Sequence, residues 1–276
     1  MTKKIYFLLC AALLLALTAC QSDSDDKYVE KPALDLYQVG LKEIKEQHFK
    51  KAGKSFEEVI RQHPYSDYAT RAQLMAAFSY YKAQEYEEAL ASINAFIQLH
   101  PANEHIPYAH YLKGLCFYNQ ISSVERDQQM TEKAMDAFLV LIQRFPSNPY
   151  AKDAAIKIDL LKEYLAGWNM EVARFYEKKM MHLAALNRFK FVVMNYETTS
   201  HVPEALFRLV EVYLQLGLIK DAQAAAVVLG HNFPGNKWYQ RAYDLLKGHN
   251  LFPKEDSLKI QRTWETHNHV AQPYYS

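Results

Sequence analysis

The sequence has 276 residues, half of them hydrophobic, and its 32 basic and 31 acidic side chains almost cancel, which leaves no basic excess for nucleic acid. Its eleven histidines and three cysteines form no His-Glu-x-x-His motif and no metal-binding cysteine pair, and it has no phosphate-binding glycine loop or serine nucleophile motif. We therefore expect no metal, no cofactor and no enzymatic activity.

The first 19 residues have the form of a secretory signal peptide. Two lysines precede an apolar run from Ile5 to Leu17, which is shorter than the roughly 20 residues that a membrane-spanning helix needs. The small residues Thr18 and Ala19 then precede Cys20, as in a bacterial lipobox. We expect cleavage before Cys20 and lipidation of that cysteine, which would anchor the mature chain to a membrane. The alternative is a secretory peptide without lipidation.

Residues 20–32 are polar and lack apolar periodicity, which predicts a short solvated tether. Gln21 stands where lipoproteins retained in the inner membrane usually carry aspartate, and this favours transport to the outer membrane. Cys10 leaves with the signal and Cys20 is lipidated, so only Cys116 remains and no internal disulfide can form. The fold must therefore be held together by packing.

Five repeats follow the tether, and each has an alanine 12 residues before a helix-ending position. These pairs are Ala52 and Pro64, Ala89 and Pro101, Ala134 and Pro146, Ala184 and Tyr196, and Ala222 and Pro234. Proline ends a helix because it lacks an amide hydrogen and clashes with the preceding turn, and Ser66 or Asp67 can cap the next helix. Apolar residues around the alanines recur with a helical period, which predicts one buried stripe per helix.

This pattern resembles the tetratricopeptide repeat, a pair of helices in about 34 residues. The alanines lie 37, 45, 50 and 38 residues apart, which indicates insertions where the steps are long. The resemblance implies an all-α superhelical solenoid of about five helix pairs whose concave side binds a peptide. We assign repeats 1–2 to residues 33–103, repeats 3–5 with a capping helix near Lys237–Lys247 to residues 104–249, and a flexible tail to residues 250–276, with a short helix around Asp256–Trp264.

Two segments depart from the simple repeat. The third repeat carries an insertion, Gln120 to Met130, which we expect to form a loop on the edge of the solenoid. Arg126 and Asp127 within it are candidates for partner contact, although a structural ion pair between them is the preferred interpretation. The fourth pair begins with a helix from Tyr150 to about Lys179, roughly 45 Å long at 1.5 Å per residue. This helix either packs against the third repeat or offers a shelf to a partner.

Particular phrases narrow the resemblance further. They are Tyr80–Tyr81, Val124–Gln128, Phe145–Tyr150, Leu160–Lys162 and Glu171–Tyr176. Together with the lipobox and the five repeats, they resemble the BamD (ComL) family of lipoproteins. The segment around Arg126 and Asp127 is the most specific, because generic tetratricopeptide repeats lack it.

The resemblance implies a non-catalytic lipoprotein of the outer membrane that faces the periplasm. Such proteins work with the BamA barrel protein, and accessory lipoproteins are further candidate partners. They help to fold and insert unfolded outer-membrane β-barrel precursors. In the family, the N-terminal repeats receive precursor segments and the C-terminal repeats dock on the POTRA domains of BamA. Two alternatives stay open: a repeat lipoprotein that scaffolds cell division or peptidoglycan synthesis, and an envelope enzyme subunit that uses the repeats for docking.

Candidate binding residues follow from this assignment. Aromatic side chains offer a large contact area at a low entropic cost, so Tyr65, Tyr68, Tyr80 and Tyr81 are candidates for the precursor groove. The alternative is that these tyrosines are half-buried packing residues. Arg188 lies in the half that the family uses for BamA and is a candidate partner contact, with a solvated helix face as the alternative.

Overall fold

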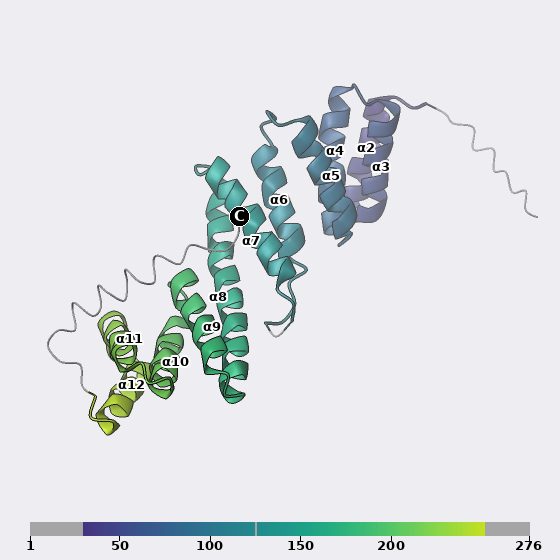
Figure 1. The fold of residues 1–276 in the computed structure, drawn as a ribbon. Coiled ribbons are helices and arrows are strands. Elements are labelled where there is room, and N and C mark those ends of the chain that lie inside the picture. The colour runs from purple at the N-terminus through teal and green to yellow at the C-terminus, as the bar shows by residue number, and fades with distance from the viewer. Residues whose placement is uncertain (1–29, 125, 252–276) are drawn as a thin grey trace, which may run out of the picture.

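The computed structural model describes residues 30–124 and 126–251 (Figure 1). In chain order its helices are α2 (Ala33–Lys45), α3 (Phe49–Gln62), α4 (Asp67–Lys82), α5 (Tyr86–Leu99), α6 (Ile106–Tyr118), α7 (Gln129–Arg144), α8 (Pro149–Lys178), α9 (His182–Asn195), α10 (Val202–Gln215), α11 (Ile219–Asn232) and α12 (Lys237–Gly248). The predicted signal peptide, the lipidated Cys20, most of the tether and the tail beyond Leu251, with its predicted short helix, lie outside the described residues.

The helices form five consecutive pairs, from α2 with α3 to α10 with α11, and α12 packs on the last pair. This confirms the predicted all-α solenoid of five helix pairs with a capping helix. In the first three pairs, each first helix also contacts the first helix of the next pair: α2 contacts α4, α4 contacts α6 and α6 contacts α8. The second helices make no comparable contact with one another in the described part of the chain. The first helices therefore line the inner side of the curve. None of the described helices is long and apolar enough to cross a membrane.

The repeat alanines are among the fully buried positions of the second helices. Ala52, Ala89, Ala134 and Ala222 are all 0% exposed, as their packing role requires. In the fourth repeat the predicted register was wrong by one residue, because Ala185 rather than Ala184 is the fully buried alanine.

The helix ends explain this shift in register. Tyr196 caps the C-terminus of α9, as Phe233 caps that of α11, so the residue equivalent to the repeat prolines is Glu197. Because no proline stands at that position, the end of the helix could not be located from the sequence to within one residue. The position of the buried alanine, which is counted from that end, was therefore off by one.

Helices within a pair cross closely where a glycine faces an aromatic ring. A Cβ atom built on Gly40 would lie 2.6 Å from Cε1 of Phe56, and one built on Gly114 would lie 2.3 Å from Cε1 of Phe138. Both rings are fully buried. At its start, α4 is capped by Ser66, whose hydroxyl oxygen accepts a 3.2 Å hydrogen bond from the backbone N–H of Ala69, which confirms the expected cap.

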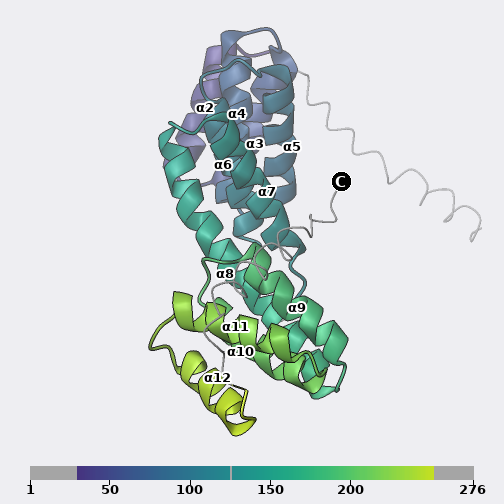
Figure 2. The ribbon, with the colours of Figure 1, turned by 60° about the vertical axis from the view of Figure 1, so that its left-hand side comes forward.

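The long helix α8 spans 30 residues, as predicted, and connects two groups of helices. Figure 2 shows it running from the upper group, α2 to α7, towards the lower group, α9 to α12. The insertion is more than a loop on the edge, because Cγ1 of Val124 lies 3.2 Å from the position of a Cβ atom on Gly167, in the middle of α8. Nε2 of His201, before α10, also lies 3.2 Å from the position of that Cβ atom. The middle of α8 is thus a packing element.

Candidate binding surfaces

The four predicted groove tyrosines do not form one surface. Tyr65 is fully exposed on the turn after α3, and Tyr68 is half-buried with its ring 5.5 Å from that of Tyr37. Tyr80 is only 4% exposed and packs against Gly53, which corrects its assignment to the groove. The helical period explains this outcome, because adjacent residues such as Tyr80 and Tyr81 point about 100° apart around the axis. Tyr81 is the half-exposed member of the pair.

A strip of aromatic side chains crosses the first helices of the second, third and fourth pairs. We call this strip the aromatic face, and its residues are Tyr81, Tyr108, Tyr111, Tyr118 and Tyr150. The ring centroids of Tyr108 and Tyr111 on α6 lie 5.2 and 5.1 Å from that of Tyr150 on α8. Tyr81 on α4 accepts a 3.0 Å hydrogen bond from Nδ2 of Asn119, next to the end of α6. Because α4, α6 and α8 form the inner layer, the aromatic face lies on the inner side of the curve.

Two hydroxyl groups of the aromatic face, those of Tyr108 and Tyr111, stay neutral. Burial raises the pKa of Tyr108 to about 12, and burial together with the nearby Asp153 carboxylate also raises the pKa of Tyr111. The hydroxyl of Tyr111 donates to Asp153, which lowers the pKa of that carboxyl, and Nζ of Lys157 pairs with the same carboxylate at 3.0 Å. The face therefore offers aromatic rings, neutral hydroxyls and one paired carboxylate, which suits an uncharged, partly apolar peptide.

Of the residues in the aromatic face, only Tyr81 was predicted from the sequence as a groove residue. Tyr108, Tyr111 and Tyr118 recur at intervals of three and seven residues, which places them on one side of a helix. That period is a usable signal within α6. Nothing local, however, indicates that Tyr150, 39 residues after Tyr111, stacks on this helix.

The insertion is organised by a glutamine rather than by an ion pair. Gln128 is 5% exposed, and its amide donates to the backbone oxygens of Val124 and Arg126 at 3.1 and 2.9 Å. In the described part of the chain, Arg126 and Asp127 form no ion pair with each other, which corrects the preferred interpretation of these two residues. Instead, a carboxylate oxygen of Asp127 accepts a 3.2 Å hydrogen bond from the N–H of Gln129, in the first turn of α7.

Arg188 has a structural contact that neither sequence interpretation included. Its Nη1 atom donates a 3.1 Å hydrogen bond to Oδ1 of Asn169, a side chain on α8 that is 3% exposed. The guanidinium also lies 5.5 Å from the ring centre of Trp168. Arg188 is half-buried, so it joins α9 to α8 and still reaches the surface.

The end of the α8–α9 hairpin exposes apolar side chains. We call this surface the apolar tip, and it consists of Phe175, Met180, Met181 and Leu183, which are 56, 71, 52 and 65% exposed. Met180 also has a φ of +59°, a backbone conformation that favours glycine. Clustered exposed apolar side chains on a folded protein mark an interaction surface. No prediction from the sequence assigned these residues to a binding surface, and Phe175 was named only within the Glu171–Tyr176 phrase. The two hydrophobic methionines in a turn are nevertheless an unusual signal.

Ion pairs fix the neighbouring helix α10 against α8. Arg174 on α8 pairs with Glu204 on α10 at 2.9 Å, and Arg208 on α10 pairs with Glu177 on α8 at 3.6 Å. Burial raises the pKa of Glu177, and the nearby Arg208 opposes that shift. These contacts hold the apolar tip in a fixed position relative to the last helix pair.

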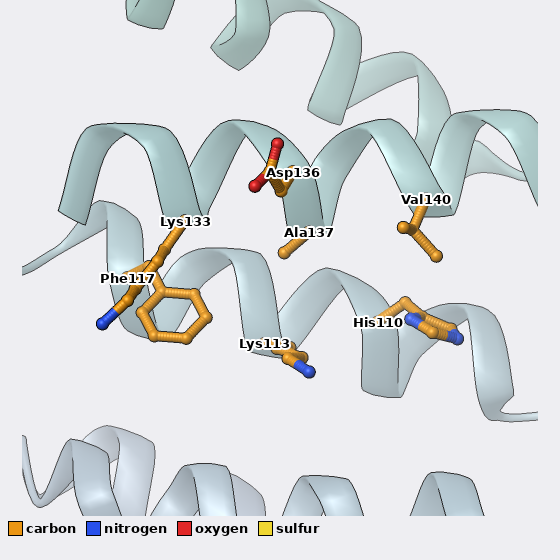
Figure 3. Close-up of a pocket in the computed structure, with 7 residues that line it drawn as sticks. All are labelled: His110, Lys113, Phe117, Lys133, Asp136, Ala137 and Val140. Carbon is orange, nitrogen blue, oxygen red and sulfur yellow. The ribbon is translucent and has the colours of Figure 1, made fainter. Parts of the chain in front are cut away.

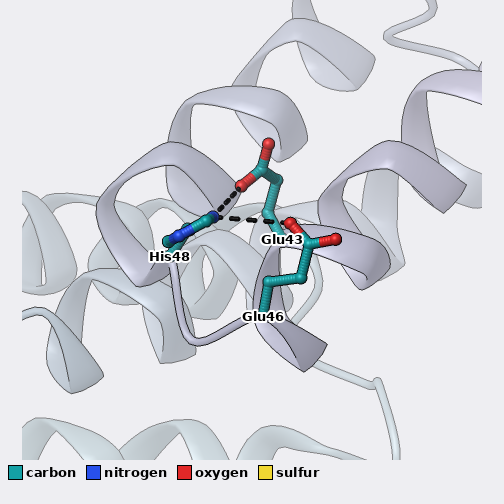
Figure 4. Close-up of side chains that lie close together, drawn as sticks. All are labelled: Glu43, Glu46 and His48. Atoms are coloured by element: carbon teal, nitrogen blue, oxygen red, sulfur yellow. Dashed lines mark hydrogen bonds and ion pairs between the residues drawn. The ribbon is translucent and has the colours of Figure 1, made fainter.

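One group of side chains in the described residues has metal-ligand chemistry (Figure 4). Nδ1 of His48 lies 3.0 Å from a carboxylate oxygen of Glu43 and 3.5 Å from one of Glu46. His48 and Glu46 are exposed, and all three residues close the tight turn between α2 and α3, where Gln47 has a φ of +60°. The contacts are accounted for by stabilisation of this turn.

Comparisons with known proteins identify the family of this chain. The profile of the YfiO family, described as outer membrane lipoprotein, matches residues 29–228. Outer membrane protein assembly factor BamD of Caulobacter vibrioides is 44% identical over 232 residues, 84% of this chain and 76% of the relative. The BamD proteins of Rickettsia prowazekii and Neisseria meningitidis are 43 and 34% identical and cover 90 and 87% of this chain and 98 and 95% of their own lengths. The chain therefore belongs to the YfiO family of outer membrane lipoproteins, the family of the assembly factor BamD.

Proposed function

We propose that this protein is a non-catalytic assembly factor for outer-membrane β-barrel proteins. Its lipid anchor is Cys20, and it faces the periplasm at the outer membrane. The aromatic face, on the first helices of the second to fourth pairs, binds unfolded precursors. The surface around Arg188 and the apolar tip, on the α8–α9 hairpin, binds the POTRA domains of a BamA-like barrel protein, with accessory lipoproteins as further partners. The observation that carries the proposal is the aromatic face on the inner side of the solenoid, in a chain of this family.

The chemistry of the aromatic face supports binding of precursors. Segments of a β-barrel protein alternate apolar and polar side chains, and their backbone groups are unpaired before the barrel closes. Rings such as Tyr108, Tyr111 and Tyr150 offer apolar contact, and tyrosine hydroxyls on this face offer hydrogen bonds to an exposed backbone. The contact is tolerant of sequence because it depends on aromatic area rather than on charge pairs.

The partner surface of the second half combines Arg188 with the apolar tip. Asn169 and Trp168 orient the Arg188 guanidinium from one side, so its remaining N–H groups are available to an acidic residue of a partner. The apolar tip supplies the exposed hydrophobic area that a stable interface needs. Charged and apolar contacts of this kind suit a folded domain such as a POTRA domain better than an unfolded segment.

The test is affinity purification of the tagged full-length chain from its own cells in detergent, followed by mass spectrometry. We expect a barrel protein with POTRA domains to co-elute in near-stoichiometric amount. Leu183→Ser, in the apolar tip, should reduce this recovery at least fivefold. Leu99→Ser is the matched control, because Leu99 is 68% exposed against 65% for Leu183 but lies on α5.

Two outcomes would contradict the proposal. If proteins of cell division or peptidoglycan synthesis co-elute in place of the barrel protein, the repeats scaffold a different envelope process. If Leu183→Ser and Leu99→Ser reduce recovery of the barrel protein equally, the apolar tip is not its docking surface.

A further inference from the structure

A hollow lies between α6 and α7, on a different side of α6 from the aromatic face (Figure 3). Its volume is about 330 Å³, and we call it the basic groove. The residues that define it are His110, Lys113, Phe117, Lys133, Asp136 and Val140. In Figure 3, Phe117 and Lys133 lie at one end, Lys113 and Asp136 in the middle, and His110 and Val140 at the other end.

Positive charge in the basic groove exceeds negative charge. Lys113 is half-buried, and its Nζ atom donates a 2.9 Å hydrogen bond to the neutral amide oxygen of Asn94 on α5. Nζ of Lys133 lies 6.0 Å from the ring centre of Phe117. Of the described side chains that line the groove, Asp136 alone is acidic, and none of these described lysines or Asp136 forms an ion pair within the chain. A bound carboxylate would therefore meet two lysines that are not neutralised.

A third cation stands at the far end of the basic groove. Nη1 of Arg144 lies 3.1 Å from Nε2 of His110. A guanidinium can only donate, so Nε2 accepts and the imidazole is neutral. Burial, with the charges of Arg144 and Lys113, lowers the pKa of His110 to about 4, which keeps it neutral at physiological pH. The partner of Arg144 in this contact is therefore neutral and does not neutralise the guanidinium.

The spacing of the cations sets the length of the ligand. Lys133 and Arg144 are 11 residues apart on α7, which corresponds to about 16 Å along the helix. An extended peptide rises about 3.3 Å per residue, so about five residues span this distance. Ala137 lies in the middle of the groove and offers apolar contact to a central side chain, while Phe117 and Val140 offer further apolar contact towards the two ends.

We propose that the basic groove binds a short acidic segment of a partner protein, in extended conformation, with carboxylates at both ends and an apolar side chain between them. The groove is independent of the aromatic face, because Tyr111 and Tyr118 lie on a different side of α6 from Lys113 and Phe117. A peptide is favoured over a membrane surface, since the apolar contacts lie in a recess between two helices, where a side chain fits.

The test measures binding of a fluorescein-labelled Glu-Asp-Leu-Asp-Glu peptide by fluorescence anisotropy. The protein is the full chain from residue 20 with Cys20→Ser, which removes the lipid. We expect saturable binding that weakens as salt is added. Lys113→Glu and Lys133→Glu should each weaken binding at least tenfold, and Lys152→Glu, the same change on an exposed lysine of α8, should change it less than twofold. Circular dichroism checks that each variant is folded.

Several results would overturn the proposal. They are equal binding of a Lys-Lys-Leu-Lys-Lys peptide, equal weakening by Lys152→Glu, or no saturable binding of the acidic peptide. A further arm uses vesicles that contain phosphatidylglycerol: if the protein binds these and not the peptide, and Lys113→Glu abolishes the binding, the groove is a lipid site instead. Because the assay contains no barrel protein or precursor, its result is distinguishable from failure of the proposed assembly role.

Discussion

Replacement of Gly114 by alanine tests the close crossing of α6 and α7. In an ordinary helix, replacement of glycine by alanine stabilises the folded protein by about 1 kcal/mol, because glycine loses more backbone conformational entropy on folding than alanine does. Here the new Cβ atom would lie 2.3, 2.5 and 2.8 Å from three ring atoms of Phe138, which is 0% exposed. Overpacking of this kind costs about 1–3 kcal/mol, and three short contacts place Gly114→Ala near the upper end. After the helical gain is subtracted, we expect a net destabilisation of about 1–2 kcal/mol.

The assay is urea unfolding followed by circular dichroism at 222 nm, a standard wavelength for helices. Gly248→Ala is the control, because a Cβ atom there meets nothing within 4 Å, and its free energy of unfolding should change by less than about 0.5 kcal/mol. Phe138→Leu makes room for the added methyl group, so the double variant should be more stable than the sum of the two single changes predicts. The reasoning is refuted if Gly114→Ala is as stable as the parent chain, or if the double variant is additive.

Three further predictions concern single residues. Met180→Gly should raise the free energy of unfolding by about 1 kcal/mol in the same assay, because Met180 has a φ of +59°, and a decrease would contradict this. The pKa of His110 is lowered from 6.5 to about 4, so stability should be full above pH 6.5 and fall as the pH drops towards 4. Between pH 7 and pH 5 the loss should be about 2 kcal/mol, and His110→Gln should lack this part of the loss. Cys116 is fully buried and burial raises its pKa to about 12, so a thiol reagent should label it only in urea; rapid labelling of the folded chain would refute its burial.

The fold could be predicted well from the sequence because each repeat is specified by residues that are close together in the chain. Prolines and alanines such as Ala52 and Pro64 mark helix ends and helix crossings within one repeat, and the structure confirms the helix pairs that they delimit. The register of the fourth repeat was predicted wrongly because its helix-ending proline is missing, and Glu197 stands in its place. The long helix α8 was predicted from the absence of proline alone.

The binding surfaces could be predicted only in part, because they depend on how the repeats stack. Burial of Tyr80 against Gly53 follows from the crossing of α3 and α4, which no single repeat specifies. The contact between Tyr111 and Tyr150 joins two repeats in the same way. The hydrogen bond of Arg188 could not be predicted either, since its acceptor Asn169 lies 19 residues away on the preceding helix. Each of these side chains is placed by tertiary contacts rather than by a local pattern.

Photo-crosslinking from the aromatic face tests the central claim most directly. A photoreactive phenylalanine analogue is placed at Tyr150, which is 38% exposed on the aromatic face, or at Leu99, which is 68% exposed on α5. Irradiation of growing cells should join the chain to outer-membrane barrel precursors from position 150 and much less from position 99, although position 99 is more exposed. Equal crosslinking from the two positions, or crosslinks from position 150 to proteins of other classes alone, would contradict it.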